Sequence, residues 1–128
     1  LMATVVCEIH NHHPLSDWTG FYRVVAPELL KIGPYQGGHG CLVIPFSRGV
    51  CGAAARSGQV LNIPDVDDFP DHIACSSTTR SELVVPVQLL STAWLIDALK
   101  QRTMAVMSGA LKRELRSQAV VDFDFMDF

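Results

Sequence analysis

The chain alternates short apolar segments with segments of turn-forming residues, and this pattern predicts more strands than helices. The strand-like segments are rich in aromatic and β-branched residues and are bounded by glycine or proline. These expected strands are residues 17–25, 41–45, 60–63, 81–87 and 119–128. Residues 27–32 fit either a short strand or a turn. Residues 119–128 alternate apolar side chains with carboxylates, which is typical of a half-buried strand.

Three segments have helical character. Residues 1–10 are apolar with few polar breaks, which we interpret as a helix rather than a strand. The alanine-rich residues 49–57 predict a short helix that ends at Gly58. From residue 92 to 116 the spacing of apolar residues predicts an amphipathic helix that Gly109 weakens. The apolar face of this helix would carry Ile96, Leu99, Thr103, Met107, Leu111 and Leu115.

These elements together predict an α+β fold in which helices pack on an antiparallel sheet. The glycine-rich residues 33–40 and the acidic residues 64–74 are expected to form loops. The sequence shows neither an internal repeat nor a linker, and its 128 residues suit a single domain, residues 1–128.

Composition narrows the classes of function. Hydrophobic residues make up 48% of the chain and charged residues 18%, which is typical of a folded protein rather than a disordered one. The net charge of −3 leaves no basic surplus for nucleic acid. There is no apolar run of about 18 residues to span a membrane, and no secretory leader pattern. The four cysteines are too sparse for a disulfide-stapled domain, so we expect a cytoplasmic protein with reduced thiols. No CxxC pair signals a zinc knuckle or a thioredoxin-type site.

Cysteines and carboxylates are the first candidates for chemistry. Three cysteines lie beside glycine-rich or irregular segments, which suits a reactive thiol with a resolving partner, although a free cysteine is often only a small buried side chain. These are Cys41, Cys51 and Cys75. Three carboxylates, Glu82, Asp122 and Asp124, lie on two expected strands. If those strands are neighbours, the carboxylates could bind an ammonium group or hold one carboxyl with a raised pKa; otherwise they form a solvated strand face.

Aromatic and histidine side chains are weaker candidates. Trp18 and Tyr22 lie on the same side of their expected strand, either as walls of a pocket for a methylated or cationic ligand or as ordinary sheet core. His72 precedes Cys75 by three residues and could stabilise a thiolate, or be a plain loop histidine. The histidines near Cys7 do not have the spacing of a zinc site, so no metal is expected.

Residues 17–87 resemble the free methionine-(R)-sulfoxide reductases, which are enzymes of the GAF fold. The resemblance rests on the segments DWTGFY (17–22), GPYQG (33–37), IPFSRGVCG (44–52), IPDV (63–66), FPDHIAC (69–75) and RSELVVP (80–86). The spacing Cys41-x9-Cys51-x23-Cys75 is similar to that of the reductases, and generic ligand-sensing GAF domains lack it.

The resemblance implies a reaction and a role in it for each of three cysteines. Cys75 would be the nucleophile, Cys41 the resolving cysteine and Cys51 an alternative partner, with the roles of Cys51 and Cys75 open to exchange. The nucleophile would take the oxygen of free methionine sulfoxide as a sulfenic acid, and a disulfide would then form. A thioredoxin-like donor would reset the disulfide, and neither a metal nor an organic cofactor would be needed.

The resemblance also implies the substrate pocket. Glu82 would bind the substrate, a carboxyl among Glu82, Asp122 and Asp124 would supply a proton, and the other carboxylates would hold the ammonium. Trp18 and Tyr22 would form its aromatic walls.

Two departures from the reductases affect this expectation. About 30 residues separate the strand 81–87 from Asp122, and we interpret residues 88–118 as a helical insertion. The ends of the chain are shorter than in the reductases, which would expose sheet surface and makes a homodimer one expected assembly. The competing interpretations are a GAF sensor of a small ligand without catalysis and a metal-dependent hydrolase.

Overall fold

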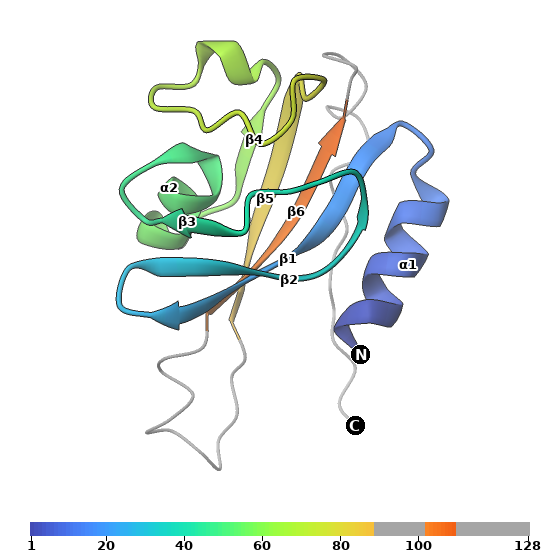
Figure 1. Ribbon diagram of the computed structural model, residues 1–128, viewed down its shortest axis with the longest axis horizontal. Coiled ribbons are helices and arrows are strands. Elements are labelled where there is room, and N and C mark those ends of the chain that lie inside the picture. Colours follow the sequence, from blue (N-terminus) through green and yellow to red (C-terminus); the bar gives the residue numbers. More distant parts are fainter. Residues whose placement is uncertain (89–101, 110–128) are drawn as a thin grey trace.

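The computed structural model describes residues 1–88 and 102–109, which form a six-stranded antiparallel sheet with helices packed on it (Figure 1). The order of the strands is β3-β2-β1-β6-β5-β4. The elements are α1 Met2–His12, β1 Ser16–Ala26, β2 Leu29–Gly37, β3 Val43–Pro45, α2 Gly49–Ser57, β4 Leu61–Ile63, the 3-10 turn η1 Val66–Asp68, β5 Ser81–Gln88 and β6 Arg102–Gly109.

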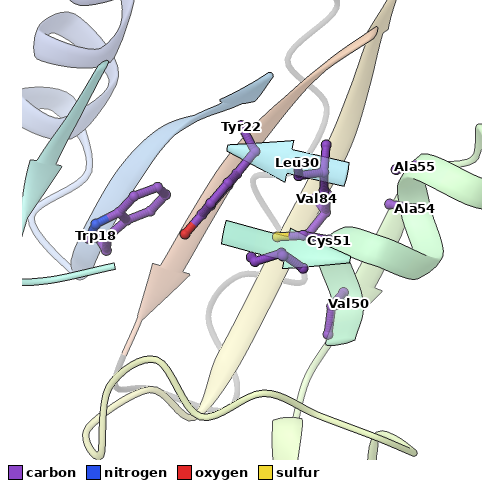
Figure 2. Close-up of a cluster of buried hydrophobic side chains, with 9 residues drawn as sticks. Trp18, Tyr22, Leu30, Val50, Cys51, Ala54, Ala55 and Val84 are labelled. Atoms are coloured by element: carbon purple, nitrogen blue, oxygen red, sulfur yellow. The ribbon is translucent and has the colours of Figure 1, made fainter. Parts of the chain in front are cut away.

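The two helices lie on opposite faces of the sheet. His10 of α1 contacts Thr19 of β1 through a 3.3 Å hydrogen bond, so α1 covers the face to which the odd-numbered residues of β1 point. The even-numbered Trp18 and Tyr22 point to the other face, where they join the core beneath α2 (Figure 2). This core on the α2 face is the one that borders the candidate site.

Most of the expected elements are confirmed. The helices expected at 1–10 and 49–57 are α1 and α2, and Gly58 ends α2 with a left-handed φ of 67°. The strands expected at 17–25, 41–45, 60–63 and 81–87 correspond to β1, β3, β4 and β5. The open choice for residues 27–32 is settled in favour of a strand, β2.

The glycine-rich segment is not entirely a loop. β2 continues to Gly37 and pairs with β1 as far as Trp18, although residues 33–40 were expected to be irregular. Glycine is needed here because a Cβ at Gly37 would meet the backbone of Asp17, and because Gly37 has a φ of 107°. The glycines therefore allow close strand pairing rather than only a flexible connection.

The prediction of a helix over residues 92–116 is wrong for residues 102–109, the part of this range that the structure describes. Residues 102–109 form β6, which pairs antiparallel with both β1 and β5. Hydrogen bonding on both edges of a central strand outweighs the helical spacing of its apolar residues. The remaining residues of the expected 88–118 insertion lie outside the described part of the chain, apart from Gln88 at the end of β5.

The sequence expects the strand of Asp122 and Asp124 to pair beside Glu82. At Glu82, however, β5 pairs with β4 on one side and with β6 on the other, so the expected pairing with β5 at this residue is wrong. Both aspartates lie outside the described residues. Within the described residues, no helix has the length and apolar character that a membrane span requires.

We expect Gly52→Ala to destabilise the fold. A Cβ at Gly52 would lie 2.5 Å from the carbonyl oxygen of Pro45 and 2.9 Å from that of Phe46, so the helix would have to shift away from β3. The clash should outweigh the gain of about 1 kcal/mol in helix propensity and lower the free energy of unfolding by about 1–3 kcal/mol. Urea unfolding measures the change, with Gly38→Ala as control because a Cβ there meets nothing within 4 Å. Equal stability of the two variants would contradict the packing described.

Candidate functional site

A pocket lies on the α2 face of the sheet, between the strands β1 and β5, the start of α2 and two irregular segments. One segment follows β2 and the other precedes β5. The lining residues are Trp18, Tyr22, His39, Gly40, Ile44, Gly49, Val50, Cys51, His72, Ile73, Cys75, Ser76, Thr79 and Glu82. The pocket thus combines an aromatic and aliphatic lining with a small number of thiol, imidazole and carboxyl groups.

A disulfide between Cys41 and Cys75 joins the two irregular segments beside the pocket. The Cα atoms of these cysteines are 5.1 Å apart, and both residues are half-buried. The hydroxyl of Tyr22 donates a 2.8 Å hydrogen bond to the carbonyl oxygen of Cys41, which fixes this segment against β1. The structure therefore brings together the two cysteines that, from the resemblance to the reductases, we expect to pair.

The third cysteine of the spacing motif lies on the other side of the pocket. The thiol of Cys51 donates a 3.2 Å hydrogen bond to Oε1 of Glu82, so that α2 and β5 are joined by this contact. Cys51 is only 4% exposed. Burial raises the pKa of the Cys51 thiol, and the nearby Glu82 carboxyl raises this pKa further. Cys51 is therefore held as a neutral thiol.

Glu82 is the carboxyl group of the pocket. Burial raises the pKa of Glu82, while the hydrogen bond from Cys51 opposes part of that rise. A carboxyl group with a raised pKa keeps its proton to higher pH and can donate it in a reaction. In the sheet, the neighbours of Glu82 are Ser108 on β6 and Ile63 on β4, and the sequence of β6 contains no aspartate or glutamate.

Aromatic rings form one wall. The rings of Trp18 and Tyr22 are stacked with centroids 5.7 Å apart, and the ring of Tyr35 also stacks with that of Trp18, at 5.5 Å. Figure 2 shows the indole nitrogen of Trp18 on the side of the ring that points away from Cys51. Burial raises the pKa of Tyr22 well above its ordinary value, and Cys51 and Glu82 add to that rise. Tyr22 is therefore a neutral hydrogen-bond donor.

The structure brings six of the eight expected site residues together. Glu82, Cys51, Cys75, Trp18 and Tyr22 line the pocket, and Cys41 is bonded to Cys75. The other two, Asp122 and Asp124, lie outside the described residues.

Two histidines line the pocket as well. His72 was considered in the sequence as a neighbour of Cys75, whereas His39 was missed. The signal for His39 was its place two residues before Cys41, inside a segment interpreted only as a loop.

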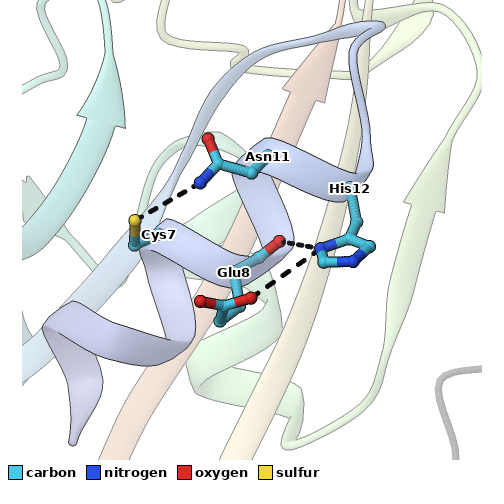
Figure 3. A network of polar contacts seen from close by, with 4 residues as sticks. All are labelled: Cys7, Glu8, Asn11 and His12. Atoms are coloured by element: carbon cyan, nitrogen blue, oxygen red, sulfur yellow. Dashed lines mark hydrogen bonds and ion pairs between the residues drawn. The ribbon is translucent and has the colours of Figure 1, made fainter.

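The cysteine and histidines of α1 are not part of this site. Asn11 donates to the sulfur of Cys7 at 3.5 Å, and the ring of His12 lies 2.8 Å from the carbonyl oxygen of Glu8 (Figure 3). These are local contacts between residues one helical turn apart. Across residues 1–88 and 102–109, no three metal-ligating side chains gather closely enough to hold an ion.

The comparisons with known proteins agree on a fold. No family model matches the sequence. A putative GAF sensor protein from Burkholderia vietnamiensis superposes with a TM-score of 0.73 at 32% identity, over 88% of this chain and 67% of that one. The sheet order, the helices and the pocket between them therefore define a GAF-fold domain.

Reductases are found in both the sequence and the structure comparisons. The free methionine-R-sulfoxide reductase of Saccharomyces cerevisiae is 47% identical over 73 residues, which are 56% of this chain and 41% of the yeast protein. The reductase of Neisseria meningitidis, solved in complex with its substrate, superposes with a TM-score of 0.73 at 37% identity, over 86% of this chain and 61% of that one. This chain is a GAF-fold domain that resembles the free methionine-R-sulfoxide reductases in both sequence and structure. It spans about half the length of the curated relatives that it matches.

Proposed function

We propose that this protein reduces free methionine-(R)-sulfoxide to methionine, with Cys75 as the nucleophile and Cys41 as the resolving thiol. One observation carries the proposal: the Cys41–Cys75 disulfide lies beside a pocket that also holds a carboxyl group with a raised pKa. Such a disulfide is the oxidised product of a thiol-dependent reduction.

The reaction balances with the groups of this pocket. The Cys75 thiolate attacks the sulfoxide sulfur, the oxygen passes to Cys75 as a sulfenic acid, and methionine leaves. The substrate sulfur is reduced by two electrons and the Cys75 sulfur is oxidised by two. The Cys41 thiol then displaces the oxygen as water and forms the disulfide. Two thiols of a thioredoxin-like donor reduce this disulfide and restore the enzyme.

Glu82 is the proposed source of the proton that the sulfoxide oxygen needs. A sulfoxide oxygen is a poor leaving group until it is protonated, and a carboxyl group with a raised pKa keeps its proton to higher pH than an ordinary one. Because burial raises its pKa, Glu82 suits this role better than an exposed carboxylate would. Cys75 lines the same pocket, on the segment that precedes β5.

The rest of the pocket suits a small amino acid. The Trp18 and Tyr22 rings offer an apolar wall for the S-methyl group. We keep Asp122 and Asp124 as proposed ammonium ligands on the resemblance to the reductases alone, because Glu82 must keep its proton to act as the acid and the described part of β6 supplies no second carboxylate. A cytoplasmic location follows from the need for a thiol donor, and a homodimer remains the proposed assembly.

A sensor without catalysis is the second candidate, because the putative GAF sensor from Burkholderia vietnamiensis shares the fold. Such a sensor would need the pocket but not the two cysteines beside it. The placement of Cys41 and Cys75 within bonding distance therefore supports the reductase over the sensor.

A single-turnover experiment tests the proposal. Protein reduced with dithiothreitol and then freed of it is mixed with excess methionine-(R)-sulfoxide. We expect one methionine per chain and a Cys41–Cys75 link by peptide mapping, with Cys7 and Cys51 still alkylated as free thiols. The (S)-sulfoxide serves as control and should yield no methionine. Methionine formation with a Cys41–Cys51 link, or with no link, would contradict the assignment of the partners.

A further inference from the structure

Cys51 is the one thiol of the pocket that the disulfide does not use. Its sulfur lies 3.2 Å from Oε1 of Glu82, and the two residues are 31 positions apart in the sequence. The contact depends on the packing of α2 against β5, since Cys51 is the third residue of α2 and Glu82 the second residue of β5. A thiol at this position has little freedom to serve as a mobile redox partner.

The backbone around Cys51 is closely packed. Gly49 has a φ of 70° and lies against Ile73, and a Cβ at Gly52 would lie 2.5 Å from the carbonyl oxygen of Pro45 and 2.9 Å from that of Phe46. These two contacts fix the first turn of α2 on both sides of Cys51. Figure 2 shows the Cys51 sulfur directed into the buried cluster near Val84, which lies on the same face of β5 as Glu82.

We propose that Cys51 is a positioning residue for Glu82: its thiol proton holds one carboxyl oxygen so that the carboxyl group stays directed into the pocket that Cys75 lines. This inference rests on the proposed function. It assigns to Cys51 a role as a hydrogen-bond donor and not as a nucleophile or a disulfide partner. Cys51 thus acts on the substrate only through Glu82.

The chemistry of the pair gives the sign of the effect. A hydrogen bond donated to a carboxylate stabilises its charged form and lowers its pKa. Removal of the thiol should therefore raise the pKa of Glu82 and leave the carboxyl group free to turn. The loss of one hydrogen bond to a charged group typically changes a rate or equilibrium constant by about tenfold or more. Because a thiol is a weak donor, we expect the rate to change by no more than about tenfold.

Other groups near Glu82 also affect its titration. Tyr22 faces the pair from β1, and His39, His72 and Cys75 line the pocket from the irregular segments. β4 contributes no charged residue, and the single charged residue of β6, Arg102, is in register with Gln88 at the far end of β5. The comparison must therefore keep these residues constant and change Cys51 alone.

The test compares Cys51→Ala with Cys51→Ser, and uses Cys7→Ala as a control that removes a thiol far from the pocket. For each reduced protein, kcat and KM for methionine-(R)-sulfoxide are measured against pH. The pKa of Glu82 is followed separately by carbon-13 NMR of labelled glutamate. The chain has only four glutamates, and the signal of Glu82 is the one that is absent from the Glu82→Gln spectrum. Circular dichroism confirms that the variants fold.

We expect Cys51→Ala to lower kcat by about tenfold with a smaller change in KM, and to raise the pKa of Glu82. Cys51→Ser restores a donor and should recover most of the lost kcat and return the pKa toward the wild-type value. An unchanged Glu82 pKa in Cys51→Ala would overturn the inference. So would equal losses in the serine and alanine variants, which would indicate a redox role for Cys51. If the wild type shows no turnover, the proposed function fails, and the NMR titration still decides the role of Cys51.

Discussion

The Cys75→Ser variant is expected to lose turnover of methionine-(R)-sulfoxide by at least about a thousandfold while it keeps its fold. A serine hydroxyl cannot take up the sulfoxide oxygen, because only a sulfur atom forms a sulfenic acid. Cys75 lies in an irregular segment and is half-buried, so its oxygen replacement should not disturb the core. Methionine release is measured by chromatography, and folding by circular dichroism.

Cys41→Ser is the matched control for Cys75→Ser, because both variants lack the disulfide. In a single turnover without a donor, Cys41→Ser should still release methionine and leave a trapped sulfenic acid on Cys75, whereas Cys75→Ser should release none. Full methionine release by Cys75→Ser would sink the assignment of the nucleophile. Release by Cys75→Ser together with its loss in Cys51→Ser would exchange the roles of the two thiols.

The Glu82→Gln variant is expected to lose about 10²–10⁴-fold in kcat, which is the usual contribution of a general acid. Glutamine keeps the size of the side chain and can accept the Cys51 hydrogen bond, but it has no proton to give. In the wild type, kcat should fall as pH rises through the raised pKa of Glu82, and this alkaline limb should be absent from Glu82→Gln. A wild-type pH profile in Glu82→Gln would show that Glu82 is not the acid.

The raised pKa of Glu82 should also make the free energy of unfolding depend on pH. A carboxyl group whose pKa is raised by folding stabilises the folded state fully below its unfolded pKa, and this contribution is lost as pH rises through the folded pKa. Glu82→Gln should therefore gain stability over the wild type as pH rises from about 4 through the raised pKa of Glu82. Urea unfolding at several pH values measures the difference, with the exposed Glu28→Gln as control.

Local patterns in the sequence were sufficient to predict most of the helices and strands. The alanine-rich segment and Gly58 predicted α2, and the β-branched run after Arg80 predicted β5. β6 was missed because its sequence, RTMAVMSG, has apolar residues at both odd- and even-numbered positions and so lacks alternation. A central strand of this kind cannot be told from a helix by spacing alone, and only its pairing with β1 and β5 identifies it.

The cysteines and the aromatic pair of the candidate site could be predicted from the sequence. The spacing of Cys41, Cys51 and Cys75 placed three thiols near one pocket, and the aromatic pair followed from strand alternation. The contact between Cys51 and Glu82 was not predictable, because it depends on how α2 packs across β5. The neighbour expected for Glu82 was wrong because β6 was missed: β6 takes the place beside Glu82 that was assigned to the strand of Asp122 and Asp124.

The most direct measurement is the consumption of free methionine-(R)-sulfoxide by this protein with dithiothreitol as the donor. We expect methionine to accumulate over many turnovers in proportion to the dithiothreitol oxidised, and the (S)-sulfoxide to remain unreduced. A reduced, folded protein that binds methionine sulfoxide and releases no methionine would contradict the account and would indicate a sensor of the GAF fold.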